Sequence, residues 1–302
     1  MKKRYVVLIV FAVLAVGVGG FLYWWTGGSA QHAKVTPARY QVEKRSDLAY
    51  VDSPDISPKQ RLDLFLPFGL KNAPVAAIWH GGGWTEGDRS LPAVQQLAYW
   101  LAERGVIGAA MGYRLAGPIN VLEQARDAAR GATWLYAHAA EYGGDPARIY
   151  FVGHSAGAQL AALVACDRKY LDELGAPATV PAGVVALAAP YDLRGDRIGS
   201  HPLAKKMIGG VFGNDREQRG AASPIAFVHP GLPPFLLIVG RGDHLLPRAQ
   251  SREMAAALRA VKVNVEVLVV PGRAHIDLFQ DMTDPGDLAG EATLRFVETP
   301  RR

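Results

Sequence analysis

Cysteine is almost absent from this chain of 302 residues, in which Cys166 is the only one. A single cysteine excludes an internal disulfide and any metal cluster held by several thiolates. Because Cys166 ends an apolar stretch, we expect a buried thiol that serves packing. With 49% hydrophobic residues the chain can instead bury a large core, and its length suits one domain.

A strong excess of charge is also lacking. The formal net charge is +5, and five basic residues lie at the two ends of the chain: Lys2, Lys3, Arg4, Arg301 and Arg302. The rest of the chain is therefore neutral on balance. This excludes the basic face that nucleic-acid binding requires, so no nucleic-acid partner is expected. The oligomeric state is left open.

One long hydrophobic run is present, from Tyr5 to Trp25, directly after the basic N-terminus. Its length matches a membrane-spanning helix, and the basic start predicts an N-terminus in the cytoplasm. We therefore expect an anchor or signal segment over residues 1–25, a linker over 26–42 and a catalytic domain over 43–302 outside the cytoplasm. Cleavage near Ala30 is the alternative and would release a secreted domain.

The remaining sequence alternates between strand-like and helix-like segments. The predicted strands are Leu48–Val51, Leu62–Leu66, Val75–His80, Val106–Met111, Ile149–Val152, Val184–Ala188, Phe235–Val239 and Val263–Val270. The predicted helices are Leu91–Arg104, Val121–Tyr142, Ala156–Ala165, Ala249–Ala260 and Glu291–Glu298. This order predicts an α/β fold with a mostly parallel sheet of about eight strands and helices on both faces.

A strand, a sharp turn and a helix meet at Gly153-His154-Ser155-Ala156-Gly157. This context is typical of a nucleophile elbow, in which a serine occupies a strained turn. The residues two before and two after that serine must be small, and both are glycine. We therefore predict Ser155 as a nucleophile.

A serine hydroxyl needs a histidine base and a carboxylate that orients it. His275 follows the last strong strand, so its loop can reach the elbow at the carboxyl edge of the sheet. Asp243 and Asp192 both end strands between Ser155 and His275. We favour Asp243 as the acid because its strand directly precedes the one that leads to His275; Asp192 then caps a helix or lines the pocket entrance.

Donors for a developing oxyanion are predicted at the end of the third main strand, in His80-Gly81-Gly82-Gly83-Trp84. Glycines allow backbone N–H groups to approach a reacting carbonyl without a side chain between them. Gly82 and Gly83 are the expected donors, together with Ala156, the residue after the nucleophile.

With these residues identified, the chain resembles the α/β-hydrolase superfamily, in its HGGGW carboxylesterase branch of feruloyl-esterase-like and hormone-sensitive-lipase-like proteins, related to kynurenine formamidases. The resemblance rests on Leu62-Asp63-Leu64-Phe65-Leu66-Pro67, His80–Trp84, Tyr113-Arg114-Leu115-Ala116, Gln124–Ala128, Gly153–Gly157, Ala222-Ser223-Pro224-Ile225 and Gly240–Pro247. It implies a carboxylic-ester hydrolase that uses Ser155, Asp243 and His275 without a metal or organic cofactor. It also implies that Tyr113 and Arg114 brace the sheet and the elbow.

The segment between Leu193 and Pro233 is too short for an independent cap domain and predicts a small lid of one or two helices. We therefore expect an accessible pocket for small to moderately sized acyl or aryl groups, with Trp84 and Tyr191 as candidate walls. Two other functions remain open: an aryl formamidase or other amidase on the same triad, and a catalytically inactive, membrane-tethered binding protein on a hydrolase scaffold. A serine peptidase is disfavoured because the chain has no gating domain.

Overall fold

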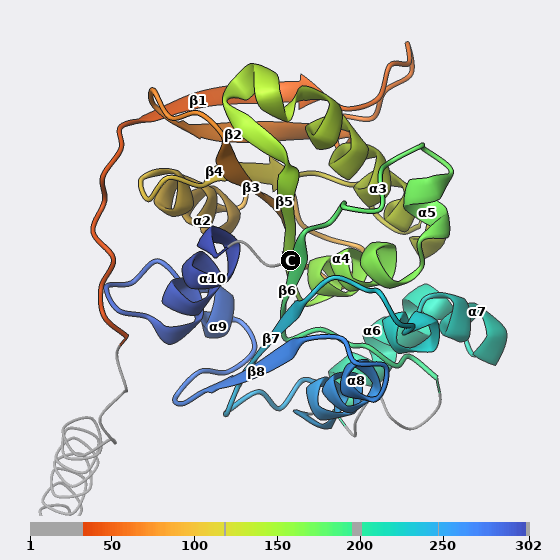
Figure 1. Cartoon of the computed structure of the whole chain (residues 1–302). Coiled ribbons are helices and arrows are strands. Elements are labelled where there is room, and N and C mark those ends of the chain that lie inside the picture. The colour runs from red at the N-terminus through yellow and green to blue at the C-terminus, as the bar shows by residue number, and fades with distance from the viewer. Residues whose placement is uncertain (1–32, 118, 195–200, 247, 300–302) are drawn as a thin grey trace, which may run out of the picture. The chain divides into compact units, whose positions relative to one another are not determined.

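The apolar runs of the sequence pair into one eight-stranded sheet (Figure 1). Its order is β1-β2-β4-β3-β5-β6-β7-β8, with antiparallel pairing at β1–β2 and β2–β4 and parallel pairing between all other neighbours. The strands are β1 (Val42–Ala49), β2 (Arg61–Pro67), β3 (Ala73–Trp79), β4 (Ile107–Met111), β5 (Gly144–His154), β6 (Gly183–Leu187), β7 (Phe235–Gly240) and β8 (Val265–Val270). The predicted mostly parallel sheet is confirmed.

This computed structural model describes residues 33–117, 119–194, 201–246 and 248–299. The chain divides into one unit of residues 1–32 and another of residues 33–302. The predicted membrane segment over residues 5–25 lies outside the described residues. Within the described ranges, no helix combines the length and the apolar character that a membrane crossing needs.

Part of the predicted linker belongs to the folded domain. The carboxylate of Glu291 accepts hydrogen bonds from the backbone N–H and the hydroxyl of Thr36, at 2.8 and 2.6 Å. The backbone N–H of Arg39 donates to the carbonyl of Glu103 at 2.7 Å. These contacts tie residues 33–41 to the unit of residues 33–302, whose first strand starts at Val42.

Helices cover both faces of the sheet (Figure 1). One face carries α2 (Pro92–Ala102), α9 (Asp277–Gln280) and α10 (Leu288–Glu298), and the other carries α3 (Val121–His138), α4 (Ala156–Cys166) and α8 (Arg248–Ala260). The other helical elements that the structure describes are η1 (Ala139–Tyr142), α5 (Lys169–Asp172), α6 (Pro202–Phe212), α7 (Arg216–Ala221) and η3 (Pro224–Phe227). The described part of the segment between Leu193 and Pro233 contains α6, α7 and η3.

Strand β3 shows how the core is divided between these two layers. Val75, Ala77 and Trp79 pack into the cluster of α3, α4 and α8. Ala76 and Ile78 pack into the cluster of α2, α9 and α10. Side chains of a strand alternate between its faces, so a continuous apolar run is what a strand covered on both sides requires.

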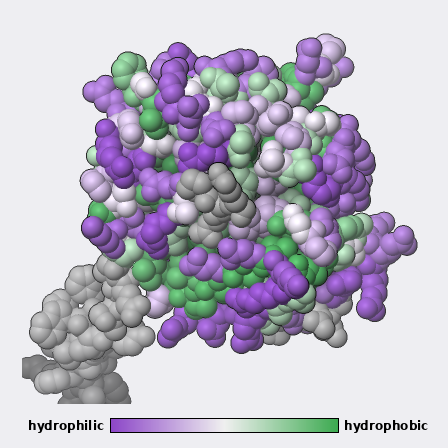
Figure 2. Space-filling view, in the orientation of Figure 1, coloured by the Kyte–Doolittle hydropathy of each residue, from purple (hydrophilic) through white to green (hydrophobic). Residues whose placement is uncertain are grey.

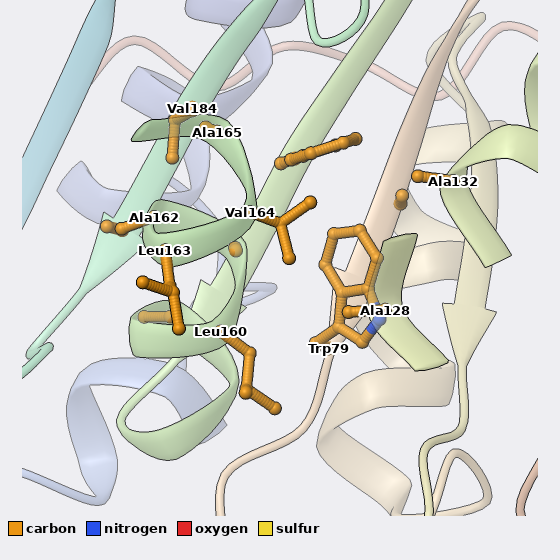
Figure 3. Packing of buried hydrophobic residues seen from close by; sticks show 14 of the residues in the cluster. Trp79, Ala128, Ala132, Leu160, Ala162, Leu163, Val164, Ala165 and Val184 are labelled. Carbon is orange, nitrogen blue, oxygen red and sulfur yellow. The ribbon is translucent and has the colours of Figure 1, made fainter. Parts of the chain in front are cut away.

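The indole of Trp79 fills the space between the sheet and two alanine-rich helices (Figure 3). Ala128 and Ala132 of α3 and Leu160 and Val164 of α4 surround it, and all of them are fully buried. Every residue of α4 is buried, including Cys166 at its C-terminal end. Small side chains let α3 cover α4 closely, which fixes the helix that follows the predicted nucleophile.

The two edges of the sheet differ in character. β1 has the sequence VEKRSDLA, and charged side chains of this kind discourage pairing with another strand. β8 has the apolar sequence VEVLVV, in which Val269 is 37% exposed. Figure 2 shows hydrophobic residues gathered along β8.

The chain reverses direction across the sheet at β3, which lies between β4 and β5. The connection from β3 to β4 contains α2 on one face, and the connection from β4 to β5 contains α3 on the other. Right-handed crossovers that leave in opposite directions open a crevice at the carboxyl ends of such strands. The glycine loop after β3 and the elbow after β5 therefore emerge side by side.

A buried carboxylate ties the start of α3 to this part of the sheet. Asp127 is fully buried and accepts hydrogen bonds from Arg114 Nε at 2.7 Å, Arg114 Nη2 at 2.8 Å and Gln60 Nε2 at 2.9 Å. The preceding Tyr113 donates its hydroxyl hydrogen bond to the carbonyl of His80 at 2.9 Å. These contacts support the predicted bracing role of Tyr113 and Arg114.

We predict that Asp127→Asn lowers the free energy of unfolding by about 3–5 kcal/mol, because it leaves the Arg114 guanidinium without its buried counter-charge. The measurement is urea denaturation. Asp172→Asn is the matched control, since its ion pair with Arg168 is exposed at the Asp172 side chain and should cost less than about 1 kcal/mol. Equal losses in the two variants would contradict the prediction.

Candidate active site

Ser155 occupies the strained turn that the sequence predicts. Its φ of 53° and ψ of −118° place it between β5 and α4, outside the regions that side chains favour. A Cβ atom on Gly157 would lie 2.3 Å from the carbonyl oxygen of Trp79, and one on Gly153 would lie 2.6 Å from the backbone N of Ala158. Only glycine permits these approaches, so the turn can form where β3 and β5 end.

Three side chains from separate strand ends meet at this turn. Ser155 Oγ lies 2.9 Å from His275 Nε2, and His275 Nδ1 lies 2.8 Å from Asp243 Oδ2. The other oxygen of Asp243 accepts backbone N–H groups from Leu245 at 2.9 Å and Leu246 at 3.1 Å. With Nδ1 donating to the carboxylate, Nε2 is free to accept the serine proton.

Asp243 stays ionised in this setting although it is buried. Burial alone would raise its pKa, but the hydrogen bond and charge of His275 and the two backbone N–H groups outweigh burial and lower the pKa of the Asp243 carboxyl. The alternative acid, Asp192, pairs with Arg194 at 2.9 and 3.0 Å. The structure therefore brings Asp243, not Asp192, to the histidine.

The predicted glycine loop lies beside the serine, since a Cβ atom on Gly81 would be 3.3 Å from Ser155 Cβ. Gly82 and Gly83 have φ values of 124° and 57°, which glycine adopts without strain. Ala156 is the first residue of α4, where a backbone N–H has no partner within the helix. The N–H of Ala156 therefore lies at a helix N-terminus, where developing negative charge is stabilised, while the donor roles of Gly82 and Gly83 stay a prediction.

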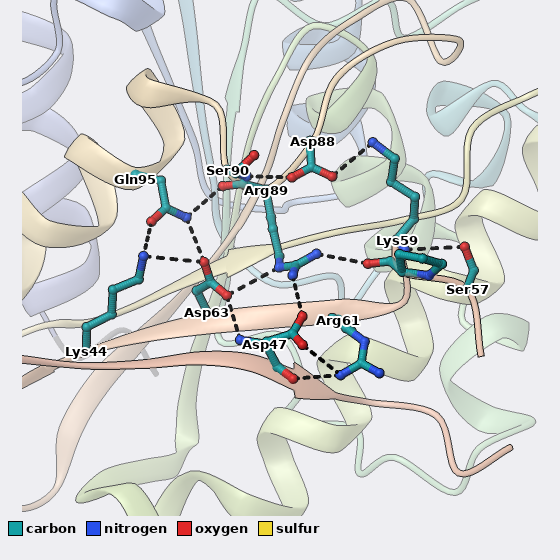
Figure 4. Close-up of polar contacts among 11 residues, drawn as sticks. Lys44, Asp47, Ser57, Lys59, Arg61, Asp63, Asp88, Arg89, Ser90 and Gln95 are labelled. Carbon is teal, nitrogen blue, oxygen red and sulfur yellow. Dashed lines mark hydrogen bonds and ion pairs between the residues drawn. The ribbon is translucent and has the colours of Figure 1, made fainter. Parts of the chain in front are cut away.

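A network of charges holds the loop that follows these glycines (Figure 4). Lys59 Nζ donates to the carbonyl of Gly87 at 2.7 Å and to the carboxylate of Asp88 at 2.9 Å. Arg89 pairs with Asp47 at 2.7 Å and with Asp63 at 3.3 Å. These contacts fix the loop to β1 and β2. They therefore also help to hold the glycines that precede it.

A cavity of about 740 Å³ opens over the serine and is lined by Gly81–Gly83, Thr85, Glu86, Gly87, Leu91–Val94, Gln96, His154, Ser155, Leu203, Met207, Leu245, His275, Ile276, Phe279 and Gln280. Its volume suits a small organic molecule. Trp84 lies elsewhere, on a second and much smaller pocket that also reaches Ser155. There its Nε1–H donates to Gln159 Oε1 at 2.8 Å.

The prediction that Tyr191 forms a pocket wall is wrong. Its side chain is fully buried in the core against α4 and α8, and burial raises the pKa of its hydroxyl. Gln250 Oε1 accepts the backbone N–H groups of Tyr191 at 2.9 Å and Asp192 at 2.8 Å. This clamp from α8 turns the ring inward, away from the cavity.

His154 contacts the segment that carries the predicted base, which the sequence alone does not reveal. Its Nε2–H donates to the backbone carbonyl of His275 at 2.8 Å, and its ring stacks on Phe279 with 5.0 Å between ring centres. His154 therefore positions the loop that carries His275. Its place inside the elbow, one residue before the nucleophile, was the available signal, but the sequence does not reveal its partner.

A model of the BD-FAE family matches residues 62–258. Among curated proteins, the chain is 30% identical over 260 residues to the probable isoprenylcysteine alpha-carbonyl methylesterase ICMEL1 of Arabidopsis thaliana, covering 80% of this chain and 52% of that protein. It is 32% identical over 236 residues to Esterase LipQ of Mycobacterium tuberculosis (strain ATCC 25618 / H37Rv), covering 74% and 52%. The chain thus spans about half the length of these relatives.

Among solved structures, esterase B from Lactobacillus rhamnosis HN001 superposes with a TM-score of 0.73 at 24% identity, covering 98% of this chain and 95% of that one. A truncated carbohydrate esterase from gut microbiota superposes with a TM-score of 0.72 at 19% identity, covering 88% and 98%. At these identities the likeness shows the fold, which is the α/β-hydrolase fold expected from the sequence.

Two buried histidines lie beside the site, and we predict that they make the protein less stable in acid. Burial lowers the pKa of His80 to about 4, and burial together with the neighbouring His275 lowers the pKa of His154 to about 3. In the unfolded chain both have a pKa near ~6.5. As the pH falls below ~6.5, the unfolded state therefore binds more protons, and the free energy of unfolding should decrease by ~1.4 kcal/mol per pH unit for each histidine.

Urea denaturation between pH 7 and pH 4.5 measures this slope. His154→Asn should make the slope shallower, because it removes one of the two histidines that take up a proton only on unfolding. Stability that stays constant over this pH range would contradict the assignment of both buried histidines as neutral.

Proposed function

Because the chain belongs to the BD-FAE family, we propose that it is a serine hydrolase that cleaves carboxylic esters of small to moderate acyl or aryl groups through Ser155, His275 and Asp243. The observation that carries the proposal is the continuous hydrogen-bond chain from Asp243 through His275 to Ser155, at 2.8 and 2.9 Å. Relatives named as esterases and methylesterases support the same reaction class.

In the first half of the reaction, Ser155 Oγ attacks the ester carbonyl carbon while His275 Nε2 takes the serine proton. The carbonyl oxygen gains negative charge and is held by the N–H groups of Gly82, Gly83 and Ala156. Protonated His275 then gives its proton to the leaving oxygen, the carbon–oxygen bond breaks, and an alcohol and an acyl-enzyme remain.

In the second half, His275 takes a proton from water as the water oxygen attacks the acyl carbon. The tetrahedral intermediate collapses, the serine oxygen receives the proton from His275, and the carboxylic acid leaves. Asp243 keeps the imidazole in one orientation and balances its charge whenever it is protonated. The intact set of groups favours an active enzyme over a binding protein on an inactive scaffold.

The membrane segment is proposed on the sequence alone. The apolar run of residues 5–25 after a basic N-terminus supports an anchor that places the catalytic domain outside the cytoplasm. The substrate would then be an ester present at or beyond the outer surface of that membrane.

We predict that Ser155→Ala abolishes covalent labelling by a fluorophosphonate and lowers kcat for 4-nitrophenyl acetate by at least ~10⁴-fold, because the acyl-enzyme cannot form. The measurements are gel-based labelling and initial rates with purified protein of unchanged circular dichroism. Retained turnover in Ser155→Ala would refute the assignment of the nucleophile.

The two candidate acids give opposite expectations. Asp243→Asn should lower kcat by roughly 10³–10⁴-fold, because an amide neither fixes the histidine tautomer nor balances the imidazolium charge. Asp192→Asn should stay within about tenfold of the parent, since its partner is Arg194. If the two results were exchanged, Asp192 would be the acid.

A further inference from the structure

Two cavities of very different size meet at Ser155. The large one, of about 740 Å³, contains His275 and the glycine loop. The small one, of about 10 Å³, lies against Trp84, Pro190 and Ile208. Neither His275 nor any glycine of the loop lines the small pocket. Apart from Ser155, Met207 and Leu245 are the only described residues that line both cavities, so these two side chains lie between them.

The geometry of the reaction assigns a part of the substrate to each cavity. The attacked carbon carries four groups: the Ser155 oxygen, the oxyanion, the leaving oxygen and the acyl chain. The oxyanion points to the N–H groups of the glycine loop, and the leaving oxygen must lie near His275 Nε2 to receive its proton. The acyl chain takes the remaining direction, toward the side of Ser155 that neither group occupies. That side holds the small pocket.

Resting on the proposed function, we propose that this chain selects esters of very small acyl groups, acetyl above all, with bulky and largely apolar alcohols, and that Met207 sets the acyl limit. A pocket of about 10 Å³ has room for roughly one water-sized group, which is also the size of a methyl group. The methyl group of an acetyl ester fills it, and longer chains require a wall to move.

Met207 is the wall that can move. Its Cε rests on the glycine loop, since a Cβ atom on Gly83 would lie 2.4 Å from it. Trp84, the largest of the other walls, is held in place: its indole N–H donates a hydrogen bond to Gln159, and its ring meets that of Phe212 edge-on with 4.8 Å between ring centres. A methionine is unbranched and adaptable, so its truncation enlarges the pocket. The truncation also removes the contact of Met207 Cε with the glycine loop, so the test compares the ratio of two esters within one variant.

The large cavity has apolar walls that suit the alcohol part of an apolar ester. Leu91, Leu203 and Ile276 line its mouth and are 41%, 50% and 56% exposed, so their aliphatic surfaces face the opening. Phe279 adds an aromatic wall next to His275. An apolar body bound there gains by leaving water, whereas a sugar would bring hydroxyl groups to a largely aliphatic rim.

The first measurement is the acyl-length profile of the parent protein, as kcat/KM for 4-nitrophenyl acetate, butyrate and hexanoate. We expect a fall of at least about tenfold from acetate to hexanoate, because the acyl chain outgrows the pocket. Met207→Ala should raise hexanoate turnover relative to acetate by about tenfold or more. Leu203→Ala, on the same helix but facing the large cavity, should leave the ratio of the two esters unchanged.

The second measurement compares two isomeric esters, 2-naphthylmethyl acetate and methyl 2-naphthylacetate. The first joins a small acyl group to a bulky alcohol, and the second reverses them, so kcat/KM should favour the first by at least about tenfold. Leu203→Ala should lower turnover of the first ester more than that of 4-nitrophenyl acetate. Glucose pentaacetate should be hydrolysed less efficiently than 2-naphthylmethyl acetate.

Each failure has a distinct signature. Ser155-dependent turnover that rises toward hexanoate, or that favours the methyl ester, overturns the acyl assignment and leaves the esterase function intact. A preference for the acetylated sugar overturns the assignment of the alcohol. Absence of both turnover and Ser155 labelling overturns the proposed function itself. The parent profile and the isomer pair remain decisive even if Met207→Ala does not fold.

Discussion

The close approach of two backbones at Gly157 is the constraint on which the site depends. A side chain there would collide with the carbonyl oxygens of Trp79 and His80, at 2.3 and 2.4 Å from the Cβ position. Because glycine removes that collision, α4 begins directly against the end of β3. The N-terminus of α4 and the glycine loop after β3 then lie side by side, and Ser155 stands between β5 and α4 in its strained turn.

The surroundings of this point are rigid on one side and adaptable on the other. The buried helix α4, the carboxylate network of Asp127 and the ion pairs of Arg89 hold the nucleophile and the donors. In contrast, α6 of the short insert contributes Leu203, which is half exposed, and a flexible methionine to the cavity. Catalysis needs donors that are fixed in position. Substrate selection depends on side chains of the insert, which can vary without moving those donors.

The sequence predicts the residues that follow from local rules, and it fails where a distant partner decides. The meeting of Ser155, Asp243 and His275 could be predicted because each follows a parallel strand, and parallel strands bring their carboxyl ends to one edge. Tyr191 also ends a strand, yet Gln250, 59 positions away along the chain, turns it into the core. The contact of His154 with the carbonyl of His275 and that of Thr36 with Glu291 are equally non-local. No periodicity or turn motif encodes such pairs.

The placement of the two cavities also determines the order in which, in the proposed reaction, the alcohol leaves and water enters. The leaving alcohol occupies the large cavity beside His275, which opens to solvent through its mouth, so it can depart while the acyl group stays behind Met207. Water then enters by the same route and meets the histidine that has just lost its proton to the alcohol. A small acyl group leaves this route clear. A bulky acyl group in the large cavity would block both the departure of the alcohol and the arrival of water, so the size of the acyl pocket bears on deacylation as well as on binding.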